Sequence, residues 1–209
     1  MNEKKSPSRA ERQKIQLRTD IIETASAEFA ERGYHQTSIS DIAQRLGIGH
    51  GTFYRHFKNK RDILDHVIDD VSSKIADTLL NENAPGAVNT LEDYREQCLR
   101  ISKQLSNIVM DNPNTARLIL LEATSIDPEM TQRIMGFFDW AAKLVSAYME
   151  HGVKLGFFRE DLDVEATGHV IVGLIMTSAL SFLRSPDDVA MQKRMADAVL
   201  RIMVDGIGV

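Results

Sequence analysis

One short stretch of this sequence gathers side chains that can hydrogen-bond to the base edges and phosphates of a nucleic acid. Six of them lie between positions 50 and 60: His50, Thr52, Tyr54, Arg55, His56 and Lys60. Imidazole, hydroxyl and phenol groups can donate hydrogen bonds to bases or phosphates, and an arginine can grip guanine or a phosphate. Lysine brings a charge for phosphate, and Gly51 has no side chain to keep a backbone at a distance. This combination favours nucleic-acid recognition.

The residue patterns of a catalytic or metal site are missing from the sequence. It shows no nucleophile–base pair and no glycine loop that would cradle phosphate, and His151 and His169 do not have the spacing of metal ligands. Cys98 is the sole cysteine, so neither an intrachain disulfide nor a cysteine-based zinc site can form. Its position on an apolar helical stripe predicts a buried thiol. We therefore expect no cofactor and no metal, and an enzyme in the C-terminal part is the weaker alternative.

The charge of the chain is divided unevenly along its length. The whole protein carries a formal charge of −5, but residues 1–62 hold 12 Lys and Arg against 8 Asp and Glu. The first part therefore has a balance of +4 and the remainder −9. Such an asymmetry is expected when the front of a protein faces nucleic acid and the rest has another task.

Two short predicted helices joined by a glycine turn would position the polar segment. Ser38 and Asp41 form a capping-box pattern at the start of the first helix. The apolar residues that follow share one helical face: Ile39, Ile42, Ala43 and Leu46. Residues 47–49 form the turn, and Phe53 and Phe57, four residues apart, direct the inner face of the second helix to the same core. The polar side chains then lie outward, where a helix can enter the major groove of DNA.

Two further segments flank this helix-turn-helix. Residues 1–18 are polar and basic, so we expect a flexible arm that either is solvated or reaches along the DNA. A helix follows with an apolar face from Ile21 to Ala30, and Gly33 can end it. After the polar segment, Asn59 is expected to cap a fourth helix, with Asp62 at its third position.

Residues 37–64, TSISDIAQRLGIGHGTFYRHFKNKRDIL, resemble the DNA-binding signature of the tetracycline-repressor (TetR) family. The run from Gly51 to Phe57, followed by Lys58-Asn59-Lys60, is its most specific part, and the match covers about residues 15–68. The family implies an all-helical homodimer in which a small N-terminal DNA-binding domain is attached to a larger effector-binding domain. It also implies a double-stranded DNA operator and two recognition helices in successive major grooves.

The resemblance also assigns roles to individual positions. The residues at 50, 52, 54 and 56 resemble the base-contacting set, Lys60 resembles a phosphate clamp, and Ser38 and Ser40 resemble contacts to the DNA backbone. Adding Gly51 and Arg55 for their chemistry completes the predicted site, although Arg55 could equally be a solvated side chain. Two positions depart from the family pattern: position 40 is often basic there, and Gly49 stands where a serine cap is common.

The sequence beyond residue 65 also predicts helices throughout. We expect them over 91–110, 114–126, 131–155 and 164–183, followed by a last one near the C-terminus, with a loop at 81–89. The 164–183 segment is apolar on most sides, so we expect it to be buried all round. With Met191, Met195, Ala198 and Ile202 of the last helix it could form a dimer interface, or simply a monomer core. The run 170–183 is too short to cross a bilayer, and no signal sequence is visible, so we expect a cytoplasmic protein without a membrane partner.

Apolar and aromatic residues of these helices could line a pocket for a small, hydrophobic effector. The candidates are Met110, Leu118, Glu122, Phe137, Trp140, Leu144, Tyr148 and Met176. Methionine and aromatic side chains adapt to irregular apolar ligands, although the same residues at helical spacing often form plain core. Glu122 would be a polar anchor, but it could also lie on the surface.

The sequence therefore predicts an all-α protein of three parts. Residues 1–18 form a basic arm, 19–65 a three-helix DNA-binding domain with a helix-turn-helix, and 66–209 a larger helical bundle for dimerisation and effector binding. The function implied is a ligand-responsive transcriptional regulator, a repressor released from a pseudo-palindromic operator by its effector. The alternative is a constitutive, architectural DNA-binding protein without a functional pocket.

Overall fold

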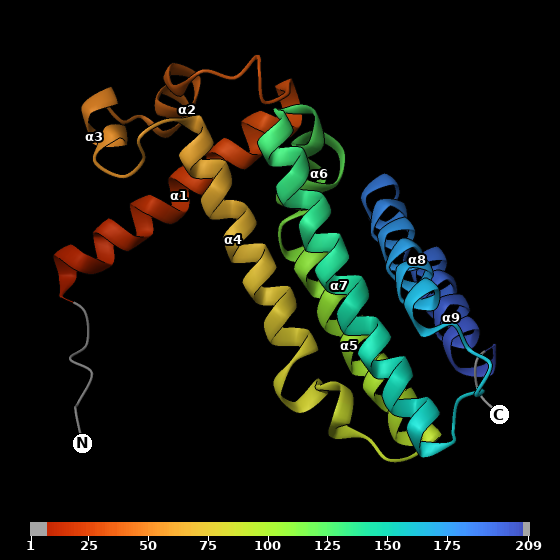
Figure 1. Cartoon of the computed structure of the whole chain (residues 1–209). Helices are drawn as coiled ribbons and strands as arrows, with labels where there is room; N and C mark the ends of the chain where they lie inside the picture. The colour runs from red at the N-terminus through yellow and green to blue at the C-terminus, as the bar shows by residue number, and fades with distance from the viewer. Residues whose placement is uncertain (1–7, 207–209) are drawn as a thin grey trace, which may run out of the picture. The chain divides into compact units, whose positions relative to one another are not determined.

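The structure, a computed structural model, describes residues 8–206 and contains helices and no β-strand over that range (Figure 1). The chain divides into two compact units, residues 1–69 and 70–209. The boundary falls within helix α4, Lys60–Leu79, rather than in a loop. The all-helical prediction is confirmed.

The first unit contains α1 (Arg9–Arg32), α2 (Ile39–Leu46), α3 (His50–Tyr54) and the first half of α4. The expectation of a flexible arm over 1–18 was wrong for residues 9–18, because α1 begins at Arg9; residues 1–7 lie outside the described residues. Ser8 accepts a hydrogen bond from the backbone N–H of Glu11, and the Glu11 carboxylate accepts one from the backbone N–H of Ser8. This capping box starts the helix before its first apolar residue.

The core of the first unit is formed by apolar residues from all four helices. Those that are almost fully buried are Ile21, Ala25, Phe29, Ile42, Ala43, Phe53, Phe57, Ile63 and Leu64. Each large side chain in such a position contributes about 1.5–3 kcal/mol relative to an exposed one. Phe53 and Phe57 lie inward, as predicted, with ring centroids 6.2 Å apart. The short α3 is therefore held in place by Phe53 of the helix and by Phe57, three residues beyond its end.

The second unit continues from α4 through two turns of 3-10 helix, η1 (Asn81–Asn83) and η2 (Pro85–Ala87), where a loop was expected. Its long helices are α5 (Leu91–Asp111), α7 (Pro128–Leu155), α8 (Val164–Arg184) and α9 (Val189–Asp205). The helix expected over 114–126 is instead three short pieces: α6 (Pro113–Arg117), a turn of π-helix η3 (Leu118–Glu122) and a 3-10 turn η4 (Ala123–Ser125).

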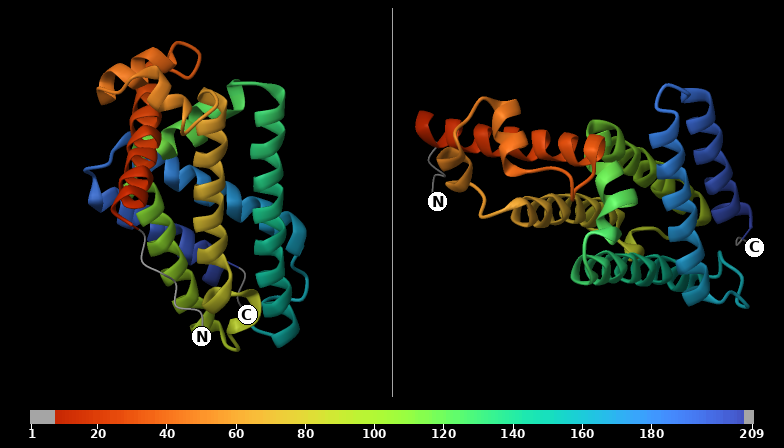
Figure 2. Two further views of the ribbon diagram at one scale, coloured as in Figure 1. Left: turned by 90° about the vertical axis from the view of Figure 1, so that its left-hand side faces the viewer. Right: turned by 90° about the horizontal axis from the view of Figure 1, so that it is seen from above.

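Helices α7 and α8 pack against each other over a shared core, and α8 crosses α7 in both views of Figure 2 (see also Figure 1). The core residues are Val88, Tyr94, Cys98, Val145, Tyr148, Met149, Phe158, Ile171 and Val204. A Cβ on Gly168 of α8 would lie 2.3 Å from the Oγ of Ser146 and 2.6 Å from the carbonyl oxygen of Ala142, both on α7. This glycine therefore allows the two helices to approach closely.

Helix α8 is not buried all round, which corrects the sequence-based expectation. Gly168, Ile171 and Phe182 are its buried residues, and only 17% of its most apolar stretch is buried. The helix extends 21 residues from Val164 with a mean hydropathy of 1.7 in that stretch, so it is long and apolar enough to cross a membrane by length and composition alone. The sequence-based expectation that no apolar stretch is long enough to cross a bilayer was therefore also wrong. An open apolar face of this kind needs a partner, whatever its nature.

Candidate nucleic-acid interface

Helix α2 is set at its start by the predicted capping box. The Ser38 hydroxyl accepts a hydrogen bond from the backbone N–H of Asp41 and donates one to the Asp41 carboxylate at 2.6 Å. That carboxylate also accepts from the backbone N–H of Ser38, and these bonds hold the pKa of Asp41 below its usual value. Gly47 ends the helix with a φ of +65°, a conformation that glycine adopts at little cost. The left-handed conformation of Gly47 directs the chain into the turn that leads to α3.

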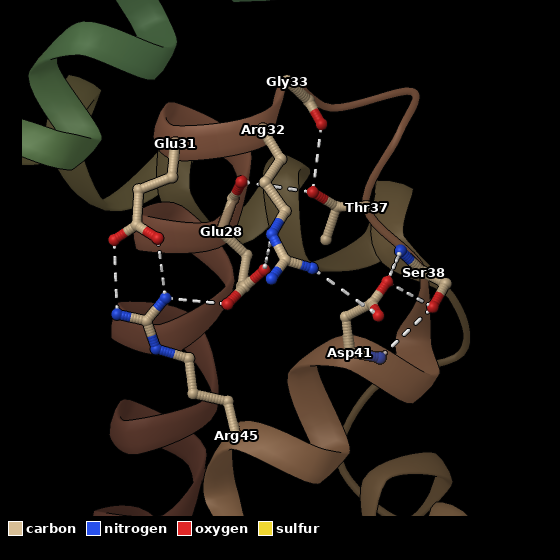
Figure 3. A network of polar contacts seen from close by, with 8 residues as sticks. All are labelled: Glu28, Glu31, Arg32, Gly33, Thr37, Ser38, Asp41 and Arg45. Carbon is tan, nitrogen blue, oxygen red and sulfur yellow. Dashed lines mark hydrogen bonds and ion pairs between the residues drawn. The ribbon is translucent and has the colours of Figure 1, made fainter.

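A network of ion pairs fixes α2 against the C-terminal half of α1 (Figure 3). Arg45 of α2 places Nη1 2.7 Å from the buried carboxylate of Glu28 and 2.9 Å from that of Glu31. Arg32 pairs with the same Glu28 at 3.4 Å and with Asp41 at 3.7 Å. Because Glu28 is only 3% exposed, loss of its cationic partners would leave a buried charge. Both arginines are thus held by carboxylates of their own unit.

The outer side of α3 presents the predicted recognition residues to solvent. His50, Gly51, Tyr54 and Arg55 are exposed, with 55% of the tyrosine accessible, while Thr52 is half-buried. Arg55 donates a hydrogen bond from Nη2 to the Thr52 hydroxyl at 3.1 Å. The edge of the Tyr54 ring packs on Phe53, with centroids 5.6 Å apart. Most of the predicted recognition positions on α3 are therefore accessible to solvent.

The C-terminal end of α3 is tied to α1 by a residue that had been placed in the flexible arm. Arg18 donates a hydrogen bond from Nη1 to the backbone carbonyl of His56 at 3.0 Å. Its guanidinium carbon also lies 4.4 Å from the centroid of the Phe57 ring, a cation–π distance. Partial burial lowers the pKa of His56, and the nearby charges of Lys14, Arg18 and Arg55 lower it further. The helical phase of the folded α1 brings Lys14 and Arg18 to the end of α3, where Arg55 already lies.

Lys60 is arranged differently from the phosphate clamp that the resemblance implies. Its ammonium group donates hydrogen bonds to the carbonyl oxygens of Tyr34 at 2.6 Å and Thr37 at 2.7 Å, and lies 4.5 Å from the centroid of the Tyr34 ring. Burial lowers its pKa. In this structure it joins the start of α4 to the loop between α1 and α2. Ser38 and Ser40 are both exposed, but the Ser38 hydroxyl is engaged by Asp41.

The effector-pocket candidates occupy the second unit in several different environments. Leu118 is fully buried and Tyr148 is 6% exposed, whereas Met110 and Trp140 are 39% and 36% exposed. The Phe137 and Trp140 rings stack with centroids 5.4 Å apart. The remaining three, Glu122, Leu144 and Met176, are half-buried. One hollow of about 500 Å³ lies along α9, lined by Met191, Arg194, Met195, Asp197, Ala198 and Arg201, and contains none of the candidates.

A buried polar cluster near the candidate Tyr148 was missed by the sequence-based reasoning. Tyr148 donates its hydroxyl to the carbonyl oxygens of Leu79 and Asn83, and the Asn83 amide donates to the carbonyl of Thr78 at 2.9 Å. Thr78 and Leu79 are the last residues of α4, so these side chains satisfy carbonyl groups that the helix end leaves open. Gln97 was missed as well, and its amide donates to the carbonyl of Ala84. Asn83 lies in a 3-10 turn and follows no helical periodicity, so no pattern in the sequence indicated its role.

Comparisons with known proteins agree on one family. The model of the "Bacterial regulatory proteins, tetR family" matches residues 21–67. A "Fatty acid metabolism regulator protein" from Bacillus subtilis (strain 168) is 28% identical over 187 residues, which cover 90% of this chain and 93% of the relative. The solved structure of the transcriptional regulator FadR from Bacillus subtilis in complex with stearoyl-CoA is similar with a TM-score of 0.71 and 25% identity, covering 90% of this chain and 98% of that one. FadR from Bacillus halodurans gives a TM-score of 0.73 at 19% identity, covering 90% of this chain and 95% of that chain.

Proposed function

The chain belongs to the tetR family of bacterial regulatory proteins, and we propose that it is a cytoplasmic repressor that leaves a pseudo-palindromic DNA operator when a hydrophobic effector binds. The family consists of transcriptional regulators rather than enzymes. The observation that carries the proposal is the outer face of α3, where His50, Tyr54 and Arg55 stand exposed on a helix anchored by Phe53. A helix presented in this way fits the major groove.

The proposed homodimer is supported by the open apolar faces of α8 and α9. Val170 of α8 is 61% exposed, and Ile202 and Met191 of α9 are 53% and 39% exposed. An apolar face of this extent on a protein of this family is best covered by a second copy of the chain. A two-fold dimer also presents two recognition helices to two half-sites one helical turn apart.

The proposed effector has a long apolar part and binds in the second unit. Support comes from the half-buried apolar and aromatic residues of α7 and α8, such as Phe137, Leu144 and Met176, and from the relative whose structure contains stearoyl-CoA. The effector acts by population shift: it binds more tightly to a conformer whose recognition helices are wrongly spaced for the operator. Helix α4 carries this change, since it begins at Lys60 in the first unit and ends at Leu79 in the second.

Operator recognition can be tested with a duplex selected from a random library by repeated binding to the full-length protein. The affinity for this selected duplex is measured by fluorescence anisotropy. The Tyr54→Ala variant is expected to lose most of its preference for the selected duplex over an unrelated one, because each lost base contact costs about 1–3 kcal/mol. Leu99→Ala removes a similarly exposed apolar residue from α5 and serves as the control. Unchanged preference in Tyr54→Ala would refute the assignment of α3.

The effector class is tested with stearoyl-CoA and with unacylated coenzyme A as the matched control. Stearoyl-CoA is expected to raise the melting temperature and to weaken binding to the selected duplex, since a ligand that binds only the folded state stabilises it. Coenzyme A should do neither. If a panel of long-chain ligands including stearoyl-CoA leaves both quantities unchanged, the effector proposal fails, and the constitutive architectural DNA-binding protein becomes the better explanation.

A further inference from the structure

We propose that Lys14, together with Arg55, binds a backbone phosphate of the DNA beside the C-terminal end of α3. The proposal rests on the proposed DNA-binding function and extends the contact surface from the helix-turn-helix to the exposed first half of α1. In the sequence these residues belong to separate segments, and Lys14 fell within the expected flexible arm. In the structure Lys14 lies on a regular helix that starts at Arg9.

The position of Lys14 relative to α3 is set by Arg18, one helical turn later on the same face of α1. Residues four apart on a helix have their Cβ atoms about 5–6 Å from each other. Arg18 is bonded to the His56 carbonyl and stacked on Phe57, so this face of α1 is directed at the end of α3. Lys14 is exposed on that face, as Arg55 is at the end of α3.

Among the described residues, the charges of Lys14 and Arg55 are not neutralised by carboxylates, unlike those of Arg32 and Arg45 in the same unit. Arg32 and Arg45 each pair with two carboxylates, including Glu28 (Figure 3). Over residues 8–206, by contrast, no carboxylate lies within ion-pair distance of Lys14 or Arg55, whose guanidinium contacts the neutral Thr52 hydroxyl. The first unit therefore has one face whose cations are neutralised and one whose cations are available to an anion.

Lys14 and Arg55 have no carboxylate partner among residues 8–206, so both side chains are available to an anionic ligand. Lys14 and Arg18 are like charges four residues apart on a helix, an arrangement that disfavours the free protein. Partial burial lowers the pKa of the His56 imidazole, and the charges of Lys14, Arg18 and Arg55 lower it further. A DNA phosphate is the anion that the neighbouring recognition residues would bring to this place. Because α1 is already helical here, no ordering of an arm opposes the contact.

The proposal is tested by the salt dependence of DNA binding, since each phosphate contact contributes about 0.9 to the slope of log affinity against log salt concentration. Lys14→Gln in the full-length protein is compared with Arg12→Gln, which removes the same charge from the same helix two residues away, on the opposite face. Binding is measured with the selected duplex and with an unrelated duplex of equal length. The KCl concentration is varied from about 50 to about 200 mM, a range over which affinity for DNA falls steeply.

In Lys14→Gln the slope is expected to fall by about 0.9 per protomer for both duplexes, with the preference between them unchanged. Lys14→Arg should restore the slope, and Arg12→Gln should leave it close to that of the original protein. The inference is overturned if Lys14→Gln and Arg12→Gln give the same slope, or if Lys14→Arg fails to restore it. Tyr54→Ala reports separately on the proposed function, because it changes the preference between duplexes rather than the slope. Circular dichroism melting verifies that each exposed-site variant is folded.

Discussion

Lys60 illustrates how one side chain can have two roles that the sequence does not distinguish. Its position in the family motif implies a contact with phosphate, whereas its ammonium group here is bonded to the carbonyl oxygens of Tyr34 and Thr37. A lysine so placed ties α4 to the loop that precedes α2. The phosphate role stays a prediction, but the structural role has a consequence of its own for stability.

We expect Lys60→Met to destabilise the folded protein by about 1–3 kcal/mol, because two part-buried carbonyl groups lose their charged donor. The methionine keeps the apolar stem, so the loss is not one of packing. Urea unfolding followed by circular dichroism measures the change, and Lys58→Met, at an exposed neighbouring lysine, is the control. If both variants unfold at the same urea concentration, the bonds seen here do not stabilise the protein.

Cys98 provides a second test at the level of single residues. Burial raises the pKa of its thiol to about 11, from a usual value of 9.0. The thiol therefore stays protonated through the physiological range, and the folded state loses stability only when the pH rises through the interval from 9 to 11. We expect alkylation by iodoacetamide at pH 8 to be slow in the folded protein and at least tenfold faster in urea, because only the thiolate reacts. Mass spectrometry of the labelled chain measures both rates, and equal rates would contradict the burial.

At the level of elements, the close pairing of α7 and α8 depends on a residue without a side chain. A Cβ on Gly168 would collide with the Ala142 carbonyl oxygen and the Ser146 hydroxyl. Around Gly136 on α7, by contrast, there is open space. The two glycines are therefore expected to respond in opposite ways to the same substitution.

Gly168→Ala is expected to lower the melting temperature, because the added methyl group must push the two helices apart. Gly136→Ala should stabilise its helix by about 0.5–1 kcal/mol, as alanine replaces glycine at an unhindered helical position. Differential scanning calorimetry of the two variants compares them directly. A melting temperature for Gly168→Ala equal to or above that of the original protein would show that α7 and α8 are not so closely packed.

At the level of the whole molecule, helix α8 is the proposed site of dimer assembly. In the proposed dimer a second copy of the chain covers its exposed apolar residues, of which Val170 is the most exposed at 61%. Because two recognition helices are needed for two half-sites, the state of assembly and the affinity for DNA should change together.

Val170→Glu is expected to shift the protein from dimer to monomer, because a carboxylate would be buried in an apolar interface. Affinity for the selected duplex should fall by at least tenfold in the same variant. Sedimentation velocity measures the assembly, and Leu99→Glu, at a comparably exposed position on α5, controls for the added charge. A Val170→Glu protein that remained dimeric would exclude this face of α8 from the interface.

Much of the local structure could be predicted from the sequence, because it depends on interactions within a few residues. The capping box of Ser38 and Asp41, the glycine that ends α1 and the inward side chains of Phe53 and Phe57 were all expected and are present. Asn59 accepts a hydrogen bond from the backbone N–H of Asp62, as predicted for the start of α4. Helical periodicity and capping are local properties, so a single sequence reveals them.

The contacts between segments that are far apart in the chain were decided only by the tertiary structure. The sequence by itself determined the all-helical class and the polar set of residues 50–60, which lie exposed or half-buried at the outer side of α3 and the start of α4. It could not place Arg18 against His56 and Phe57, or direct the ammonium of Lys60 to Tyr34, because these contacts depend on how helices pack. Nor could it show that α8 has an open face, since an apolar helix looks the same in sequence whether its neighbours belong to its own chain or to another.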